Sequence, residues 1–131
     1  MPYLTVRGVD HYYEWIIFEG DATGHRSVRS DRLPPTSEKP VMVFLHGWAG
    51  SCRYWERVAR ALATDFNCLL YDLRGFGRSR LPRPLPETVS ALGYELESYA
   101  DDLETLIQHL GLSQVYINAH STGASIATLY G

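Results

Sequence analysis

The sequence predicts an α/β protein with a mostly parallel sheet, an N-terminal hairpin and flanking helices. Three short apolar runs are each bounded by turn residues, which is typical of strands that are covered on both faces. Segments with helical periodicity follow the runs in strict alternation, and this order indicates βαβ units. The chain has 131 residues, a length that fits a single domain.

The first 40 residues are expected to form a hairpin followed by a surface loop. Tyr3–Val6 and His11–Phe18 are rich in aromatic and β-branched residues, and they flank a turn expected at Gly8-Val9-Asp10. Residues Gly20–Pro40 are polar and include glycine, serine and a Pro-Pro pair, so we expect a loop over the surface there.

The three apolar runs are predicted to be buried parallel strands, at Val41–Leu45, Cys68–Tyr71 and Val115–Ala119. A helix is expected after each strand, and the third of these begins at Thr122. The second ends at Gly111, a residue that suits a helix C-terminus. The apolar faces of the first two helices recur every three or four residues, at Trp55, Val58, Ala59 and Leu62 and then at Tyr99, Leu103, Leu106, Ile107 and Leu110.

Composition excludes several functional classes. Twelve basic and fifteen acidic residues give a net charge of −3, which favours no nucleic-acid partner. No apolar run reaches the roughly 18 to 20 residues that span a bilayer. The start has no signal-peptide pattern, and two cysteines are too few for a disulfide framework, so we expect a cytoplasmic protein with reduced thiols. Neither a metal-ligand spacing nor a complete nucleotide-binding motif is present, so we expect no metal and no cofactor.

The strongest chemical signal is the pentapeptide from Ala119 to Gly123, which has the pattern small-x-Ser-x-Gly. A strand that turns abruptly into a helix holds the central Ser121 in a strained conformation, so the residues two positions away must be small. The following helix then directs free N–H groups and the positive end of its dipole toward developing negative charge. The pentapeptide alone is a weak signal, because serine is also a common helix cap.

Context makes the signal specific. His46–Ser51 directly follows the first buried strand and Asp72–Ser79 follows the second. With these loops and the pentapeptide in this order, the chain resembles the N-terminal half of the α/β-hydrolase fold superfamily.

The resemblance implies a role for each matching residue. Ser121 would be the nucleophile that forms an acyl-enzyme. The backbone N–H groups of Trp48 and Thr122 would form the oxyanion hole. The remaining matching positions, Ala119 and Gly123 in the elbow and His46 and Gly47 in the oxyanion loop, would be structural.

The other titratable residues are expected to be structural. A base must reach the serine hydroxyl from a separate loop, so His46 and His120 are rejected as bases. Asp72 precedes the serine and is expected to organise its loop by pairing with Arg74 or with backbone N–H groups. The remaining acidic and histidine side chains are assigned to a solvated helix face (Asp101, Asp102 and Glu104) or to structural positions (His11, His25 and His109).

The resemblance therefore implies a serine hydrolase of carboxylic esters or related acyl compounds, acting on a small molecule. A serine at this position disfavours the dehalogenase and epoxide-hydrolase members, which need a carboxylate. We expect residues 1–131 to be the N-terminal part of one domain that is incomplete at its C-terminus. The triad acid and histidine would come from a complementary C-terminal segment, and without it the chain would be inactive or nearly so. The alternatives are a non-catalytic module for binding or assembly, a carbon–carbon bond hydrolase and a cofactor-free peroxidase of the same superfamily.

Overall fold

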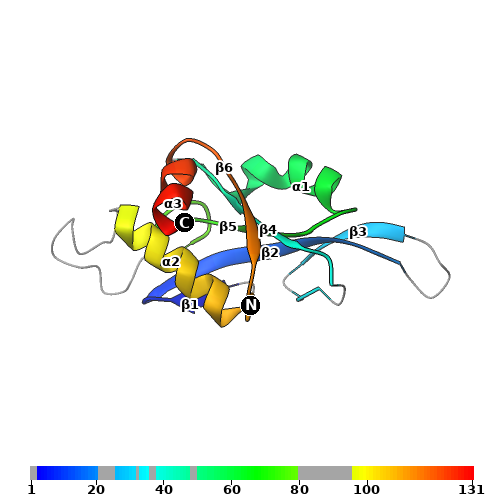
Figure 1. Ribbon diagram of the computed structural model, residues 1–131, viewed down its shortest axis with the longest axis horizontal. Coiled ribbons are helices and arrows are strands. Elements are labelled where there is room, and N and C mark those ends of the chain that lie inside the picture. Colours follow the sequence, from blue (N-terminus) through cyan, green and yellow to red (C-terminus); the bar gives the residue numbers. More distant parts are fainter. Residues whose placement is uncertain (1–2, 21–25, 32, 36–37, 48–49, 80–95) are drawn as a thin grey trace.

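The computed structural model describes residues 3–20, 26–31, 33–35, 38–47, 50–79 and 96–131. A sheet of six strands lies between helices (Figure 1). In chain order the elements are β1 (Tyr3–Val6), β2 (Val9–Gly20), β3 (Arg26–Asp31), β4 (Val41–Leu45), the 3₁₀ helix η1 (Cys52–Trp55), α1 (Glu56–Leu62), β5 (Asn67–Tyr71), α2 (Leu96–His109), β6 (Val115–Ala119) and α3 (Thr122–Tyr130).

The sheet has the order β1-β2-β5-β4-β6, with β3 paired to β2. Strand β4 lies between β5 and β6 and is parallel to both. Strand β2 is antiparallel to β1, β3 and β5. The predicted α/β class, with its parallel strands and N-terminal hairpin, is therefore confirmed. The sheet as a whole is mixed, because each described pairing of β2 is antiparallel.

The hairpin has a tighter turn than the sequence suggested. Arg7 and Gly8 alone connect β1 to β2, both with positive φ (50° and 80°), and Val6 pairs with Val9. Two-residue hairpin turns of type I′ need positive φ at both central residues, and their backbone twist matches the right-handed twist of the strands. The turn expected at Gly8-Val9-Asp10 was wrong in its position, since Val9 and Asp10 already belong to β2.

The prediction of a continuous loop over Gly20–Pro40 was also wrong, because Arg26–Asp31 forms strand β3. Its residues pair with Trp15–Gly20 of β2 in antiparallel register. Strand β3 lies outside the path of the central strands and is mostly polar. Hydrogen bonds to β2 hold it, and Val28 packs against the smaller core cluster. A search for apolar runs could not find such a strand.

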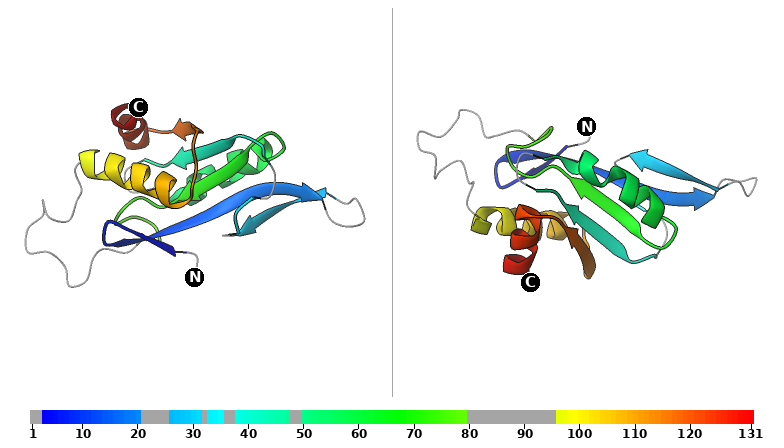
Figure 2. Two further views of the ribbon diagram at one scale, coloured as in Figure 1. Left: turned by 60° about the horizontal axis from the view of Figure 1, so that its bottom comes forward. Right: turned by 90° about the horizontal axis from the view of Figure 1, so that it is seen from above.

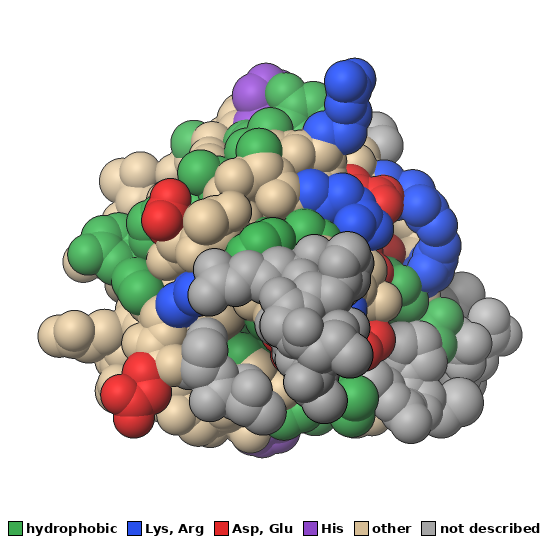
Figure 3. Space-filling model, turned by 90° about the vertical axis from the view of Figure 1, so that its right-hand side faces the viewer, with side chains coloured by type: hydrophobic (Ala, Val, Ile, Leu, Met, Phe, Trp, Pro, Cys, Tyr) green, Lys and Arg blue, Asp and Glu red, His purple; other side chains and the backbone are tan. Residues whose placement is uncertain are grey.

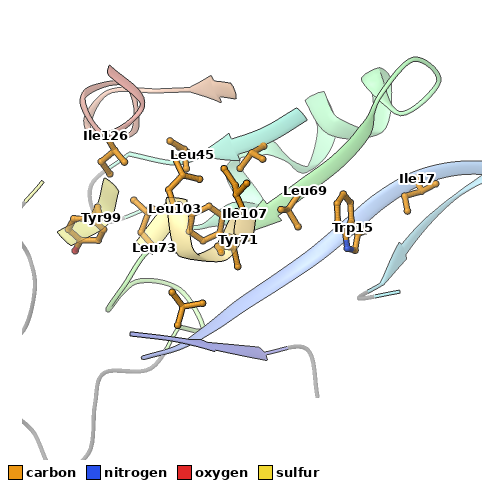
Figure 4. Packing of buried hydrophobic residues seen from close by; sticks show 13 residues of the cluster. Trp15, Ile17, Leu45, Leu69, Tyr71, Leu73, Tyr99, Leu103, Ile107 and Ile126 are labelled. Carbon is orange, nitrogen blue, oxygen red and sulfur yellow. The ribbon is translucent and has the colours of Figure 1, made fainter. Parts of the chain in front are cut away.

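The two faces of the sheet are covered by different helices (Figure 2). Residues of β2 alternate between them: Trp15 and Ile17 pack into the cluster that contains α2 and α3 residues, whereas Ile16 packs with Ala59 of α1. The larger cluster brings Leu69 and Tyr71 of β5 together with Leu103 of α2 (Figure 4). Side chains on a strand alternate in direction, so one sheet supports both cores.

Strand β5 and the second half of β4, from Val43 to Leu45, are buried as predicted, but β6 is not. Each residue of β5 is buried, whereas Tyr116 of β6 is 59% exposed and its neighbours are half-buried. Strand β6 pairs with β4, and no second partner strand lies beside it among the described residues. Val58, expected on the buried face of its helix, is 41% exposed. The end of α2 agrees with prediction, since Gly111 has φ +70° and the N–H of Leu112 donates to the carbonyl of Ile107.

The surface carries intermixed charges. Basic side chains gather at one corner of the face in Figure 3, and acidic side chains lie among them. Arg29 pairs with Glu19 at 2.9 Å, and Arg60 lies 3.5 Å from Glu56 on α1. Over the part of the chain that the structure describes, no helix combines the length and the apolar character needed to cross a membrane.

Candidate active site

The turn from β6 into α3 holds Ser121 in an unusual backbone conformation. Ser121 has φ 57° and ψ −119°, and it is the N-cap of α3 without a capping hydrogen bond from its own side chain. A non-glycine residue in this region costs on the order of 1–3 kcal/mol and persists where the surroundings enforce it. Here the N–H of His120 donates to the carbonyl of Leu45 at 3.2 Å, and the N–H of Gly123 donates to the carbonyl of His120 at 3.0 Å.

Position 123 packs so closely against the end of β4 that only glycine fits there. A Cβ atom at this position would lie 2.6 Å from the carbonyl oxygen of Leu45 and 2.8 Å from that of His46. Both contacts are with backbone that is held in the sheet or at its end, so it cannot move aside cheaply. On the other side of the turn, Ala119 pairs in register with Leu45. The small residues of the pentapeptide thus let the first turn of α3 approach β4.

The backbone N–H groups at the start of α3 differ in whether they find an acceptor. The N–H groups of Gly123, Ala124 and Ser125 donate to the carbonyls of His120 and Ser121, whereas that of Thr122 has no acceptor among the described residues. Gly47 faces the elbow, since a Cβ there would lie 3.3 Å from the Cβ of Ser121. The N–H of Gly50 donates to the carbonyl of Gly47 at 3.0 Å and closes the loop after β4. Trp48, the predicted second oxyanion donor, lies outside the described residues.

His46 is buried beside this loop, and both of its ring nitrogens are engaged. Nδ1 lies 2.7 Å from the carbonyl of Gly47, and Nε2 accepts a hydrogen bond from the N–H of Leu73 at 2.9 Å. The two contacts select the tautomer with hydrogen on Nδ1. Burial lowers the pKa of His46, although the bond to Gly47 and the charge of Asp72 oppose the shift. His46 therefore connects two loops and has no free nitrogen that could accept a proton from Ser121.

A pocket of about 230 Å³ opens at the elbow. Its described lining consists of Gly47, Gly50, Tyr54, His120 and Ser121. The rings of Tyr54 and His120 stack with centroids 5.0 Å apart and an interplanar angle of 29°. No hydrogen bond to the Ser121 hydroxyl is found between described residues. The pocket is thus lined by the exposed residue Ser121, and no described base contacts the Ser121 hydroxyl.

Asp72 organises the loops behind the site through backbone N–H groups. Its two carboxylate oxygens accept from the N–H of Cys52 at 2.6 Å and from that of Arg78 at 2.8 Å. A Cβ at Gly77 would lie 2.4 Å from the same carboxylate, so the loop after β5 closes around it. The backbone alternative of the prediction is therefore the observed one. Arg74 pairs elsewhere.

Arg74 pairs with Asp102, which the sequence had placed on the solvated face of its helix. That assignment was wrong for Asp102, whose side chain is 2% exposed, although Asp101 and Glu104 are exposed. The Arg74 guanidinium donates to both carboxylate oxygens at 2.9 and 3.0 Å, and Arg7 donates at 3.2 Å. The ring of the buried His11 lies 3.6 Å away.

The helical spacing carried a signal for this burial. Asp102 comes three residues after Tyr99 and four before Leu106, so it lies on the apolar stripe of α2. Burial alone would raise the pKa of Asp102. The contacts and charges of His11 and Arg74 outweigh burial and lower that pKa below its usual value.

Comparison with known proteins finds relatives over most of the chain. The alpha/beta hydrolase fold family model matches residues 40–131. The chain is 36% identical to a soluble epoxide hydrolase of Corynebacterium sp. over 86 residues, which are 66% of this chain and 27% of the relative. It is 34% identical to a proline iminopeptidase of Lactobacillus acidophilus, covering 72% of this chain and 31% of that protein.

Among solved structures, an epoxide hydrolase from Vigna radiata superposes with a TM-score of 0.71 at 26% identity. The match covers 98% of this chain and 33% of that structure. The chain therefore spans roughly a third of the length of these relatives.

Proposed function

The chain belongs to the alpha/beta hydrolase fold family, and on that premise we propose that it carries the nucleophile of a serine hydrolase acting on carboxylic esters or related acyl compounds. The observation that carries the proposal is the backbone of Ser121 at φ 57° and ψ −119°, at the sharp turn from β6 into α3. This conformation lets the hydroxyl project beyond the end of the sheet into the pocket while the helix N-terminus lies behind it.

In the proposed reaction the Ser121 hydroxyl oxygen attacks the carbonyl carbon of the substrate. The hydroxyl proton passes to a base, and the carbonyl π electrons move to its oxygen, which becomes negatively charged. The N–H of Thr122 would donate to this oxyanion, and we assign the second donor to the N–H of Trp48. Collapse of the intermediate expels the alcohol and leaves an acyl group on Ser121, which water then removes. Losing one oxyanion donor costs on the order of a hundred- to a thousandfold in rate.

We assign the base and its orienting carboxylate to residues outside this sequence, in a C-terminal segment of the same protein. Two observations support this assignment. Both ring nitrogens of His46 are engaged, and the His120 ring stacks on Tyr54. The chain also spans roughly a third of the length of its relatives, so most of their sequence has no counterpart here. By itself this chain would then have little or no activity.

The side chain at the elbow separates this proposal from epoxide hydrolysis. A carboxylate that opens an epoxide forms an ester, whose carbonyl carbon water can attack to release the product. A serine hydroxyl that attacked the epoxide carbon would instead form an ether, which has no carbonyl carbon for water to attack. The residue at the turn is Ser121, so we propose acyl chemistry despite the similarity to epoxide hydrolases.

The proposed substrate is a small acyl compound, and the chemistry described requires no cofactor. Cys52 and Cys68 are both buried free thiols, which supports a reducing compartment, and we place the protein in the cytoplasm.

A second candidate is a non-catalytic module that uses the fold for binding or assembly. It is favoured by the lack of any described side chain that activates the Ser121 hydroxyl. The two candidates differ in the nucleophilicity of Ser121. A hydrolase needs an activated serine hydroxyl, whereas a binding module does not.

Labelling with a fluorophosphonate separates the candidates. An activated serine oxygen attacks phosphorus and expels fluoride, so we expect the protein as encoded by its gene to be labelled on Ser121. Ser121→Ala should abolish the label. Ser125→Ala, which removes an exposed serine one turn further along α3, should leave the label unchanged. If the folded natural protein remains unlabelled, the hydrolase proposal is wrong.

A further inference from the structure

We propose that Tyr54 and His120 form an aromatic wall that selects acyl compounds carrying a planar aromatic group beside the bond that is cleaved. The inference rests on the proposed function of Ser121, because it concerns the substrate of the same pocket. It assigns a specificity role to two side chains that the proposed reaction steps do not use.

A continuous series of ring contacts holds the wall in place. The core residue Phe44 contacts Trp55 with centroids 5.4 Å apart, and Trp55 contacts Tyr54 edge to face at 5.0 Å. The indole N–H of Trp55 donates to the carbonyl of Leu45 at 3.0 Å. Tyr54 then stacks on His120 at 5.0 Å. The exposed ring of Tyr54 is thus fixed by a partner anchored in the core, and binding a ligand requires little further ordering.

The wall faces the proposed nucleophile. Tyr54, His120 and Ser121 line the same pocket. The Tyr54 side chain is an exposed aromatic, with 58% of its surface accessible. A tyrosine ordered on two sides yet open to solvent leaves part of its ring surface for a ligand. A group packed on this wall therefore lies in the same pocket as Ser121.

The size and charge of the pocket indicate the class of group. Its volume is about 230 Å³, and an apolar cavity of roughly 150 Å³ is known to bind benzene. Among its described lining residues there is no carboxylate, lysine or arginine to pair with a charged substituent. Aromatic rings attract one another in offset-stacked and edge-to-face arrangements beyond the effect of area alone. A saturated ring of similar size lacks this attraction, so the wall distinguishes the two.

The test uses two fluorophosphonates that differ only in the alkoxy group, benzyloxy in one and cyclohexylmethoxy in the other. Each reacts by attack of the Ser121 oxygen on phosphorus, with loss of fluoride and transfer of the hydroxyl proton to base. The measured quantity is the ratio of the two second-order labelling rates, in the natural protein and in its variants.

We expect Tyr54→Leu to lower the benzyl-to-cyclohexylmethyl ratio about two- to tenfold, the factor that one aromatic pair contributes. Tyr54→Phe keeps the ring and should keep the ratio. Val58→Ala changes an exposed apolar residue on α1 outside the lining and should also leave the ratio unchanged. Because Tyr54 is exposed, its variants should retain the fold, which a thermal melt verifies.

The outcomes separate the two proposals. Suppose that both probes label Ser121 and that the benzyl-to-cyclohexylmethyl ratio of Tyr54→Leu stays within about 1.5-fold of the natural protein's ratio. The aromatic wall is then refuted, while the assignment of the nucleophile stands. If neither probe labels the natural protein, the proposed function itself fails and the wall fails with it.

Discussion

Replacing Asp102 with asparagine should destabilise the protein far more than the same change at the adjacent Asp101. Both carboxylates lie on α2, but the Asp102 side chain is 2% exposed whereas that of Asp101 is 60% exposed. Asparagine has nearly the same volume as aspartate, so neither change opens a cavity. The pair of variants therefore isolates the effect of charge and hydrogen bonding at a buried and at an exposed position.

The contacts set the expected magnitudes. Asp102 accepts two hydrogen bonds from Arg74 and one from Arg7, at 2.9–3.2 Å. Removing one partner of a buried ion pair leaves an uncompensated charge and costs about 3–5 kcal/mol. Asp101 lies 4.0 Å from an exposed nitrogen of Arg7, and such surface pairs contribute about 0–1 kcal/mol. We expect the two variants to differ by at least about 2 kcal/mol.

The difference should depend on pH in a defined direction. His11 and Arg74 lower the pKa of Asp102 in the folded state against the effect of burial. A carboxyl group with a lowered folded pKa contributes its stability above its unfolded pKa of about 3.9 and loses it as the pH falls through the folded value. The destabilisation by Asp102→Asn should therefore be complete at pH 7 and shrink below about pH 4.

Equilibrium urea denaturation of the natural protein and the two variants measures both effects. With an m-value of about 1–3 kcal/mol per M, a loss of 3 kcal/mol lowers the midpoint by at least about 1 M. Unchanged m-values would show that the denatured states are comparable. If the Asp101→Asn and Asp102→Asn midpoints agree within about 0.2 M, the buried ion pair does not stabilise the fold.

Two further predictions follow from the packing of the site and core. Gly123→Ala places a Cβ 2.6 Å from the carbonyl oxygen of Leu45 and should cost about 1–3 kcal/mol and lower fluorophosphonate labelling. Ser125→Ala on the same helix is the control, and equal stability of the two variants in urea would contradict the steric argument. Burial raises the pKa of Cys52 far above its usual value and that of Cys68 to about 11, so both thiols should resist a thiol-specific reagent at pH 8 until urea unfolds the protein. Modification of the native protein as fast as of the unfolded protein would contradict this burial.

Much of the fold was predictable because short-range rules decide it. The buried runs at Val41–Leu45 and Cys68–Tyr71 carry their strand signal in consecutive residues, and Gly111 marks a helix end through its own backbone freedom. The elbow is local in the same sense. Its small residues are needed because position 123 lies in contact with the end of β4. The five-residue pattern therefore suffices to predict the elbow.

The remaining features depend on contacts between distant segments. Strand β3 is mostly polar and forms by pairing with β2, so its sequence has no apolar run from which a strand could be predicted. Asp102 is buried because α2 packs against β1 and lies beside the loop after β5, where the Arg74 guanidinium donates to the Asp102 carboxylate. Tyr54 and His120 meet because β4 and β6 are neighbours. Periodicity and turn chemistry act over a few residues, so the sequence alone determined the strands other than β3, the α-helices and the serine turn. The pairing of β3, the buried ion pair and the aromatic wall depend on which segments the tertiary structure places side by side.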